Sequence, residues 1–410
     1  MSPKRKLVVI GGGASGFFCA VNAARLHQDL EVVVLEKTTK LLSKVKVSGG
    51  GRCNVTHASE EVQDMLHAYP RGMRLLKKTL HQFSPQDTIE WFGERGVDLK
   101  VEADGRMFPV SNQSQSIIDC LLAEATKYGV VVKTSMDVLS IKKEDEHFLL
   151  EVKDAHQSVT QMQAALVCVA TGGYPKLSGF DWLARLGHAI SEPVPSLFTF
   201  NIPDKQLHAL MGVAVKHAVV KIPVLKAVEV GPLLITHWGF SGPAILKLSS
   251  RCARELHNME YTFDVSVNWL PEYHESNTLD YLKSYKQNTK GTIGAKQPFG
   301  LVTRLWHYLL LRSAIDPETD WGNVPNAQMV LLSKTLCNDV YHAKGKTTFK
   351  EEFVTAGGIA LQEMDANTME SKKVKGLFFA GEVMDVDGIT GGYNFQHAWT
   401  SGWIVANSIT

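Results

Sequence analysis

A glycine-rich segment near the N-terminus has the spacing of a dinucleotide-binding turn. Gly11-Gly12-Gly13-Ala14-Ser15-Gly16 fits the pattern G-x-G-x-x-G, and Glu36 follows 20 residues after Gly16. Gly11 permits a tight turn, Gly13 lets the backbone approach a pyrophosphate, and Gly16 lets a helix pack closely on a strand. The helix N-terminus offers N–H groups to the anion, and Glu36 would accept hydrogen bonds from ribose hydroxyls. Because an acid there disfavours a 2′-phosphate, the pattern predicts FAD or NAD rather than NADP.

The residues around this turn predict the elements that position it. Lys6 to Ile10 and Glu31 to Leu35 are β-branched runs, and Gly16 to Leu26 between them is an apolar stretch typical of a helix. A strand, a helix and a second strand in this order form a βαβ unit. We therefore expect an α/β fold with a Rossmann-type domain.

Two later segments repeat the arrangement of a strand followed by a glycine turn. The apolar run from Ala164 to Ala170 ends in Thr171-Gly172-Gly173, and the run from Gly376 to Ala380 ends in Gly381-Glu382. Ligands bind outside the carboxyl ends of the strands in open parallel sheets. The three glycine turns should therefore lie at one ligand-binding edge.

The middle of the chain has a different character. Ala214 to Val230 and Tyr261 to Val267 are β-rich, whereas Thr278 to Arg312 is a polar helical stretch. We expect a cofactor domain built from residues 1–191 and 352–410. An inserted β-rich domain would comprise residues 192–268 and 322–351, and a small helical domain would comprise residues 269–321.

Composition excludes several classes of protein. With 44% hydrophobic and 21% charged residues in 410, the chain is neither disordered nor a membrane protein. A formal net charge of +1 gives no global attraction to nucleic acid or to an acidic membrane. The six cysteines lack the spacing of a disulfide scaffold or a zinc site, so we expect reduced thiols, no metal and a cytoplasmic location. Lys4-Arg5-Lys6 and the apolar residues after it resemble a signal peptide, but three consecutive glycines interrupt that stretch.

Motifs along the whole chain resemble one family. They are Ser48 to Thr56 (SGGGRCNVT), Ala170 to Gly173, Thr236 to Pro243 (THWGFSGP), Thr368 to Lys372 and Gly381 to Gln396. Together they are similar to the BaiN/RdsA family of FAD-dependent oxidoreductases, which includes the YhiN-like flavoproteins. The resemblance implies a bound FAD and a fold related to the glutathione-reductase class, with an inserted β-barrel-like domain and a helical domain. Leu42, Lys46, His57 and the loop Tyr174 to Phe180 depart from the usual pattern.

Pattern and resemblance together give a set of cofactor-binding candidates on the glycine turns and their flanks. They are Gly11, Gly13, Ala14, Ser15, Gly16, Glu36, Lys37, Lys44, Ser48, Gly49, Gly50, Arg52, Cys53, Asn54, Thr171, Gly172, Gly173, Gly381, Glu382, Asp387, Gly391, Gly392, Tyr393 and Asn394. Gly391-Gly392 would open the last helix, from Tyr393 to about Asn407, and place its N-terminus beside the flavin ring. Asp385 and Asp387 are either ribityl contacts or simple turn acids.

Three side chains are candidates for catalysis, and each has a structural alternative. Cys53 lies in the glycine loop, but Cys120 is the next cysteine, so a buried inert thiol is preferred to disulfide chemistry. His237 could transfer a proton or be held by backbone, and Tyr393 could contact the flavin or only pack. Arg52 would bind phosphate or form an ion pair. Ser241 is interpreted as a helix cap, since Pro243 does not fit a nucleophile elbow.

The leading hypothesis is hydride transfer through FAD from NADH or NADPH to an electron-poor C=C bond. The resemblance offers two substrates, an unsaturated small molecule or a uracil of 23S ribosomal RNA. A set of cations could bind RNA: Lys4, Arg5, Lys6, Lys40, Lys44, Lys46, Arg71, Arg74, Lys77 and Lys78. Flavin-dependent amine oxidation and a non-catalytic, flavin-stabilised RNA-binding protein are the alternatives. We expect no membrane partner; a monomer is compatible with the sequence, which does not fix the oligomeric state.

Overall fold

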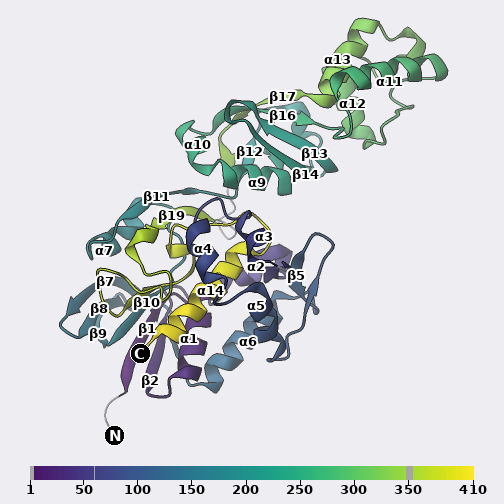
Figure 1. The fold of residues 1–410 in the computed structure, drawn as a ribbon. Coiled ribbons are helices and arrows are strands. Elements are labelled where there is room, and N and C mark those ends of the chain that lie inside the picture. Colours follow the sequence, from purple (N-terminus) through teal and green to yellow (C-terminus); the bar gives the residue numbers. More distant parts are fainter. Residues whose placement is uncertain (1–3, 60, 348–353) are drawn as a thin grey trace. The chain divides into compact units, whose positions relative to one another are not determined.

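The chain forms two compact units. The computed structural model describes residues 4–59, 61–347 and 354–410. The first unit comprises residues 1–196 and 350–410, and the second comprises residues 197–349 (Figure 1). The first unit therefore joins both ends of the chain around an insertion.

A parallel sheet forms the centre of the first unit. Its strands lie in the order β20 (Leu377–Phe379), β10 (Leu166–Val169), β1 (Arg5–Ile10), β2 (Leu30–Leu35) and β6 (Val131–Lys133). Each neighbouring pair is parallel. Apart from Arg5, Lys6 and Glu31 at the starts of β1 and β2, the strands β20, β10, β1 and β2 are apolar runs rather than alternating ones, because helices and loops bury them on both faces. The parallel order brings the carboxyl ends of all five strands to one edge.

Two helices from opposite ends of the chain pack together on this sheet. α1 (Ala14–Leu26) contacts α14 (Tyr393–Ser408) along its length (Figure 1). Gly402 permits the close approach, because a Cβ there would lie 2.7 Å from the carbonyl oxygen of Ser15. The remaining helices of this unit are α2 (Ser43–Gly51), α3 (Val62–Leu66), α4 (Met73–Thr79), α5 (Pro85–Gly93), α6 (Ser114–Lys127) and α7 (Asp181–Ala184).

Smaller sheets complete the first unit. They are β3 (Thr56–His57), β5 (Arg106–Pro109) and β4 (Leu99–Val101); β7 (Asp137–Glu144), β8 (His147–Lys153) and β9 (Val159–Ala164); and β11 (Ile190–Pro195) with β19 (Thr355–Ile359). β3 matters for the site because it lies at the end of the Ser48 to Thr56 motif.

The second unit has its own sheet and core. The sheet order is β17 (Asp339–Lys344), β16 (Thr262–Asn268), β13 (Ala214–Ile222), β14 (Ala227–Ile235), β15 (Gly239–Ser241), β12 (Thr199–Asn201) and β18 (Lys346–Thr347). Its helices are α8 (Lys205–His208), α9 (Pro243–Arg251), α10 (Ala253–Asn258), α11 (Glu275–Asn288), α12 (Thr303–Arg312) and α13 (Asn326–Cys337). One buried apolar cluster runs through the sheet and these helices.

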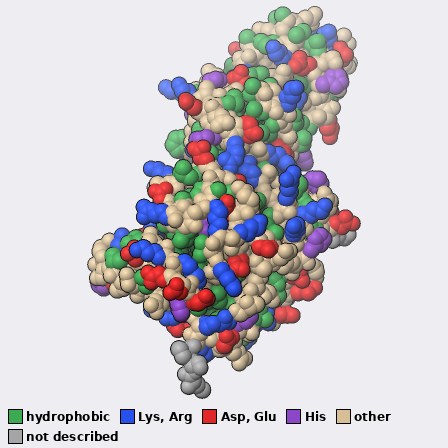
Figure 2. All heavy atoms as spheres, turned by 60° about the vertical axis from the view of Figure 1, so that its left-hand side comes forward, with side chains coloured by type: hydrophobic (Ala, Val, Ile, Leu, Met, Phe, Trp, Pro, Cys, Tyr) green, Lys and Arg blue, Asp and Glu red, His purple; other side chains and the backbone are tan. Residues whose placement is uncertain are grey.

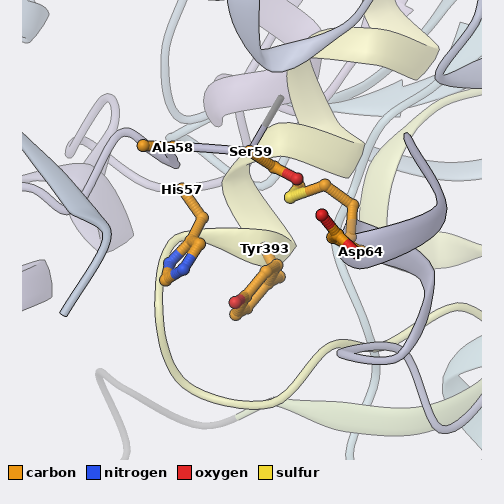
Figure 3. Close-up of a pocket in the computed structure, with 6 residues that line it drawn as sticks. His57, Ala58, Ser59, Asp64 and Tyr393 are labelled. Atoms are coloured by element: carbon orange, nitrogen blue, oxygen red, sulfur yellow. The ribbon is translucent and has the colours of Figure 1, made fainter. Parts of the chain in front are cut away.

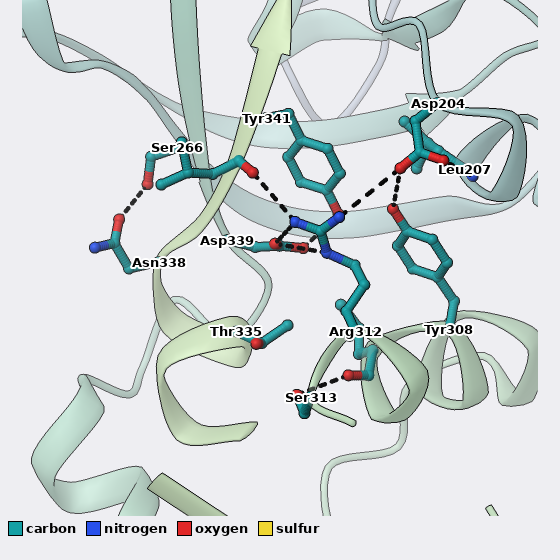
Figure 4. A network of polar contacts seen from close by, with 12 residues as sticks. Asp204, Leu207, Ser266, Tyr308, Arg312, Ser313, Thr335, Asn338, Asp339 and Tyr341 are labelled. Atoms are coloured by element: carbon teal, nitrogen blue, oxygen red, sulfur yellow. Dashed lines mark hydrogen bonds and ion pairs between the residues drawn. The ribbon is translucent and has the colours of Figure 1, made fainter. Parts of the chain in front are cut away.

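An ion pair between the half-buried Arg312 and the buried Asp339 connects the helices of the second unit to its sheet. Arg312, at the end of α12, donates to the Asp339 carboxylate at 2.7 and 3.0 Å (Figure 4). Trp269 donates to the same carboxylate at 3.1 Å, and Tyr308 donates to Asp204 at 3.0 Å. Burial raises the pKa of Asp339, and the Arg312 charge opposes that shift. The division of this unit into a β-rich and a helical domain stays a prediction, and α13 lies within the range 322–351 expected to be β-rich.

Two local predictions differ from the structure. Ser241 does not cap α9; it ends β15, which pairs with β12 and β14. Gly242 is the N-cap residue, with φ of 95°, and a Cβ there would lie 2.8 Å from the Pro232 carbonyl oxygen. The strand depends on pairing with distant residues, so the local pattern did not reveal it. The expected helical stretch from Thr278 to Arg312 is likewise two helices, α11 and α12, with a loop between them.

Candidate functional site

The three glycine turns lie at one edge of the parallel sheet. They follow β1, β10 and β20, which are neighbours in the sheet. Gly11 approaches the turn after β10 so closely that a Cβ would lie 2.3 Å from the Ala170 carbonyl oxygen. The Ser15 hydroxyl donates to the Ala380 carbonyl oxygen at 3.3 Å. The fold thus brings together turns that lie far apart in the sequence.

The glycine motif leaves space where a pyrophosphate would lie. Gly13 is the N-cap residue of α1, and a Cβ built on it meets no atom within 4 Å. A Cβ on Gly16, in contrast, would lie 2.0 Å from the Gly11 carbonyl oxygen. No side chain caps α1 and its first turn carries no acid, so its N–H groups face an opening of positive potential. These features fit the dinucleotide part of FAD.

Glu36 lies after the end of β2 beside the same turn. Its carboxylate accepts from the Gly12 N–H at 2.8 Å and from the Thr38 N–H and hydroxyl at 2.8 Å. These bonds hold the carboxylate in place, and further lone pairs stay available for ribose hydroxyls. Lys37 forms an ion pair of its own, because its ammonium lies 3.4 Å from the Asp137 carboxylate.

The second glycine loop breaks the helix α2. Gly49, Gly50 and Gly51 have φ of 57°, 68° and 83°, a region that favours glycine. Cβ atoms on Gly50 and Gly51 would meet no atom within 4 Å, so a flat ring can approach this backbone. Ser48 donates to the Val45 carbonyl oxygen at 2.9 Å and so stabilises the entry to the loop.

Two side chains of this loop have structural partners. The Arg52 guanidinium lies 2.6 Å from Glu102 and 3.9 Å from the ring of Phe108, which matches the ion-pair alternative. Cys53 is fully buried, and burial raises the pKa of its thiol to about 12. A thiol of this kind stays neutral, so the structure favours an inert Cys53.

Glu382 joins the remaining turns. Its carboxylate contacts the Lys44 ammonium at 2.6 Å and accepts from the Thr355 N–H at 2.8 Å. A Cβ on Gly173 would lie 3.1 Å from the same carboxylate. Lys44, Gly173 and Glu382, predicted separately from the sequence, are therefore close together.

Asp387 is held inside the first unit. Its side chain is fully buried and accepts from Arg71 and from the Ser196 hydroxyl. Burial raises the pKa of Asp387, and the Arg71 charge opposes that shift. Asn394 holds the neighbouring turn by exchanging hydrogen bonds with Gly388 at 2.8 and 2.9 Å. Asp387 and Asn394 thus hold the segment that precedes α14 in place.

A hollow of about 270 Å³ opens beside the start of α14 (Figure 3). It is lined by His57, Ala58, Ser59, Asp64, Met65 and Tyr393. The rings of His57 and Tyr393 stack with centroids 4.7 Å apart, and the Tyr69 hydroxyl donates to the Tyr393 carbonyl oxygen at 2.7 Å. Burial raises the pKa of Tyr393 to about 12, so its hydroxyl keeps its proton near neutral pH.

The two other histidines of interest differ in environment. His397 is fully buried on α14, and burial lowers its pKa to about 4, so it is neutral. His237 lies in the second unit, exposed on the loop between β14 and β15, with its ring 4.6 Å from that of Trp238. The role of His237 stays a prediction.

The sequence did not single out most of the walls of the hollow. Met65 and Asp64 come from the short helix α3, and Ser59 follows the two-residue strand β3. These segments carry no recognisable spacing, because their common position depends on tertiary packing alone. Only Tyr393 was predicted as a site residue, from the glycines that precede it.

Comparison with known proteins identifies the family. The family described as HI0933-like protein Rossmann domain matches residues 5–408. The chain belongs to this family. Two relatives named ribosomal RNA dihydrouridine synthase are 30% identical (Haemophilus influenzae, covering all of both chains) and 31% identical (Escherichia coli, 98% of this chain and 97% of the relative). A 3-dehydro-bile acid delta(4,6)-reductase of Clostridium scindens is 27% identical over 98% of each chain.

Solved structures show the same fold at low identity. A flavocytochrome c3 fumarate reductase aligns with a TM-score of 0.52 and 16% identity over 99% of this chain and 78% of that one. A 3-ketosteroid delta1-dehydrogenase of Sterolibacterium denitrificans aligns with a TM-score of 0.53 and 12% identity over 99% of both chains. The expected Rossmann-type FAD-binding fold is thereby confirmed. The family and its curated relatives confirm the expectation that this HI0933-like protein is an FAD-dependent oxidoreductase.

None of the helices formed by residues 4–59, 61–347 and 354–410 combines the length and the apolar content that a bilayer span requires.

Proposed function

We propose that this protein reduces the C=C bond of a uracil base in 23S ribosomal RNA to give dihydrouridine. The observation that carries the proposal is the match to a ribosomal RNA dihydrouridine synthase over all of both chains, at 30% identity. The aligned region covers the segments that carry the glycine turns and the hollow.

The residues of the sheet edge would hold the cofactor. Gly13 and the N-terminus of α1 would bind the pyrophosphate, Glu36 the ribose hydroxyls, and the loop from Gly49 to Gly51 the flat ring. Bound FAD, once reduced, would supply the hydride, and the protein would supply orientation and exclude water. Lys44 and Glu382 would fix the polar side of this site.

Tyr393 would supply the proton. Reduction of a C=C bond adds a hydride to one carbon and a proton to the other, so a general acid must face the base. Tyr393 lines the hollow, and its ring stacks against His57. Its hydroxyl stays protonated because burial raises its pKa to about 12. The His57 Nδ1 lies 3.1 Å from the Gly391 carbonyl oxygen, and this hydrogen bond orients the stack.

NADH or NADPH would reduce the flavin between turnovers. The chain has no second strand followed by G-x-G-x-x-G, so the nicotinamide would bind transiently. A ribosomal substrate places the proposed activity in the cytoplasm.

A small unsaturated molecule is the second candidate substrate. It is favoured by the bile acid reductase, which matches 98% of this chain at 27% identity. Both candidates need hydride transfer to an activated C=C bond, so they differ in the acceptor and not in the chemistry.

Mass spectrometry of ribosomal RNA separates the two. The protein, loaded with FAD and supplied with NADH or NADPH, is incubated with 23S RNA from cells that lack it. The proposal predicts one uridine that gains two hydrogen atoms, and no gain with the Gly13→Val variant. Unchanged RNA, together with consumption of NADH or NADPH when an unsaturated steroid is added, would establish the small-molecule alternative.

A further inference from the structure

We propose that the exposed face of α4 is an RNA-binding surface that holds the phosphates beside the reacting nucleotide. The α4 face is defined as Arg74, Lys77, Lys78 and the following His81. The inference rests on the proposed function for its substrate class, but the surface itself is argued from charge and position.

The cations that the sequence offered for RNA do not all remain available. Arg5 lies 3.3 Å from Asp29 and Lys6 lies 3.5 Å from Glu31. Lys44 pairs with Glu382, and Arg71 pairs with the buried Asp387. Among the described residues, Arg74, Lys77 and Lys78 form no ion pair with an acid. The α4 face therefore keeps its charge for a partner.

The α4 segment has an apolar, buried side and a basic, exposed side. Leu75, Leu76 and Thr79 are buried, whereas Arg74, Lys77, Lys78 and His81 are exposed. The spacing of three and four residues puts Arg74, Lys77 and Lys78 on one helix face, and His81 follows in the turn after the helix. From residue 65 to residue 86 the sequence contains no Asp or Glu.

This arrangement costs stability in the free protein. Like charges three and four residues apart repel, and Arg74 lies in the first turn, where the helix dipole disfavours a cation. Lys77 and Lys78 lie in the last turn, where the dipole favours them, but Arg74 has no such compensation. An anionic partner on this face removes the cost.

The helix α4 packs against the two helices that line the hollow. α4 contacts α3 and α14, the two helices that supply Met65 and Tyr393 to the hollow. A base that reacts must leave its stack and enter a pocket, so the phosphates of its own strand lie just outside that pocket. The α4 face is placed to meet them.

Local charge is needed because the molecule offers no global field. The net charge is +1, and Figure 2 shows Lys and Arg side chains interspersed with Asp and Glu over the face drawn. Binding to RNA through phosphates must therefore come from particular elements that lack acids, as α4 does.

The test measures how RNA binding depends on salt. FAD-loaded full-length protein is titrated with unmodified 23S RNA transcript over a series of KCl concentrations. The triple variant Arg74→Gln, Lys77→Gln, Lys78→Gln should bind more weakly, and its slope of log Kd against log salt should be shallower by about 2, from ~0.7 for each lost phosphate contact. The control variant Lys133→Gln, Lys142→Gln, Lys375→Gln removes the same charge from other exposed sites of the first unit.

The controls distinguish failure of the RNA-binding surface from failure of the proposed function. Both triple variants should retain FAD and its reduction by NADH or NADPH, and the control should keep the wild-type slope. An α4 variant with the wild-type slope, or equal loss in the control variant, would overturn the surface even if wild-type protein forms dihydrouridine. The RNA-binding surface would also be overturned if the α4 variant lost binding to anionic phospholipid vesicles while its RNA binding stayed intact. A shallower slope without dihydrouridine would instead leave the surface in place and contradict the proposed function.

Discussion

Gly13 is the residue at which cofactor binding separates most cleanly from folding. Its backbone, with φ of −94° and ψ of −168°, is allowed for any residue, and a Cβ there meets only open space. Gly13→Val should fold with a loss of about 1 kcal/mol, because valine is a poorer N-cap than glycine. The side chain would occupy the pyrophosphate position, so FAD should be absent from the purified variant, as read from its absorption spectrum.

A glycine of the second unit gives the matched control. Gly322 also has open space around its Cβ and no positive φ. Gly322→Val should therefore retain FAD at the wild-type level. Full FAD occupancy in Gly13→Val would show that the glycine motif is not the nucleotide site.

Tyr393→Phe should slow substrate reduction while FAD stays bound. A positioned general acid contributes about 10²- to 10⁴-fold to rate, and phenylalanine keeps the ring stacked on His57. The tyrosine is the acid below its pKa of about 12, so the wild-type rate of hydride transfer should not fall through loss of that proton between pH 7 and about 10. Rapid-mixing measurement of flavin reoxidation by substrate gives the rate of the Tyr393→Phe variant and the pH dependence of the wild-type rate. Tyr281→Phe is the control. A wild-type rate in Tyr393→Phe would assign the proton to another donor.

The sequence predicts those site residues whose positions are fixed locally. Gly11, Gly13, Gly16 and Glu36 belong to one βαβ unit, so their spacing alone places them. The hollow is different, because His57, Met65 and Tyr393 come from three segments that meet only after folding. No spacing rule connects these segments. Among the departures from the family pattern noted in the sequence, His57 lies in the wall of the hollow.

At the scale of elements, the contact between α1 and α14 positions both helix N-termini at the sheet edge. Gly402→Ala would put a Cβ 2.7 Å from the Ser15 carbonyl oxygen and 3.1 Å from the Cys19 nitrogen. The helices would have to move apart, at a cost of about 1 to 3 kcal/mol in the free energy of unfolding. Urea unfolding should show this loss, and FAD should bind more weakly.

A substitution at Gly93 of α5 should change the free energy of unfolding in the opposite direction to Gly402→Ala. A Cβ on Gly93 would meet no atom within 4 Å, so Gly93→Ala should stabilise the protein slightly, by up to about 1 kcal/mol from helix propensity. Equal effects of the two substitutions would show that close packing at Gly402 does not limit the contact between the helices.

Element prediction from the sequence succeeded where the signal was long and local. The last helix, expected from Tyr393 to about Asn407, runs from Tyr393 to Ser408. The strand at Gly239–Ser241 was missed, because a three-residue strand is specified by its neighbours β12 and β14 rather than by its own residues.

At the scale of the whole molecule, each unit has its own apolar core, so damage to one should leave the other intact. Arg312→Met removes the partner of the buried Asp339 and should destabilise the second unit by about 3 kcal/mol. Urea unfolding followed by tryptophan fluorescence reports this loss, because Trp269, Trp306 and Trp321 are buried there. Arg251→Met, which removes an exposed partner of Glu229, should cost less than about 1 kcal/mol. FAD should stay bound in both variants, and its loss from Arg312→Met would contradict the independence of the units.

The sequence predicts the domain organisation from the Rossmann pattern, which the two chain ends share and the middle lacks. Its three domains, with limits at 191 and 352, stay a prediction, and the chain divides into two compact units at 196 and 350. The exact division depends on which strands pair, and β11 with β19 pairs inside the first unit.

The most direct measurement is the anaerobic visible spectrum of the purified protein, followed through addition of NADH or NADPH and then of 23S RNA that lacks the modification. Flavin absorption bands should bleach with the nicotinamide and return when RNA is added. Bleaching that RNA does not reverse would contradict the RNA substrate. A colourless protein that takes up no added FAD would contradict the assignment of an FAD site to the edge of the sheet.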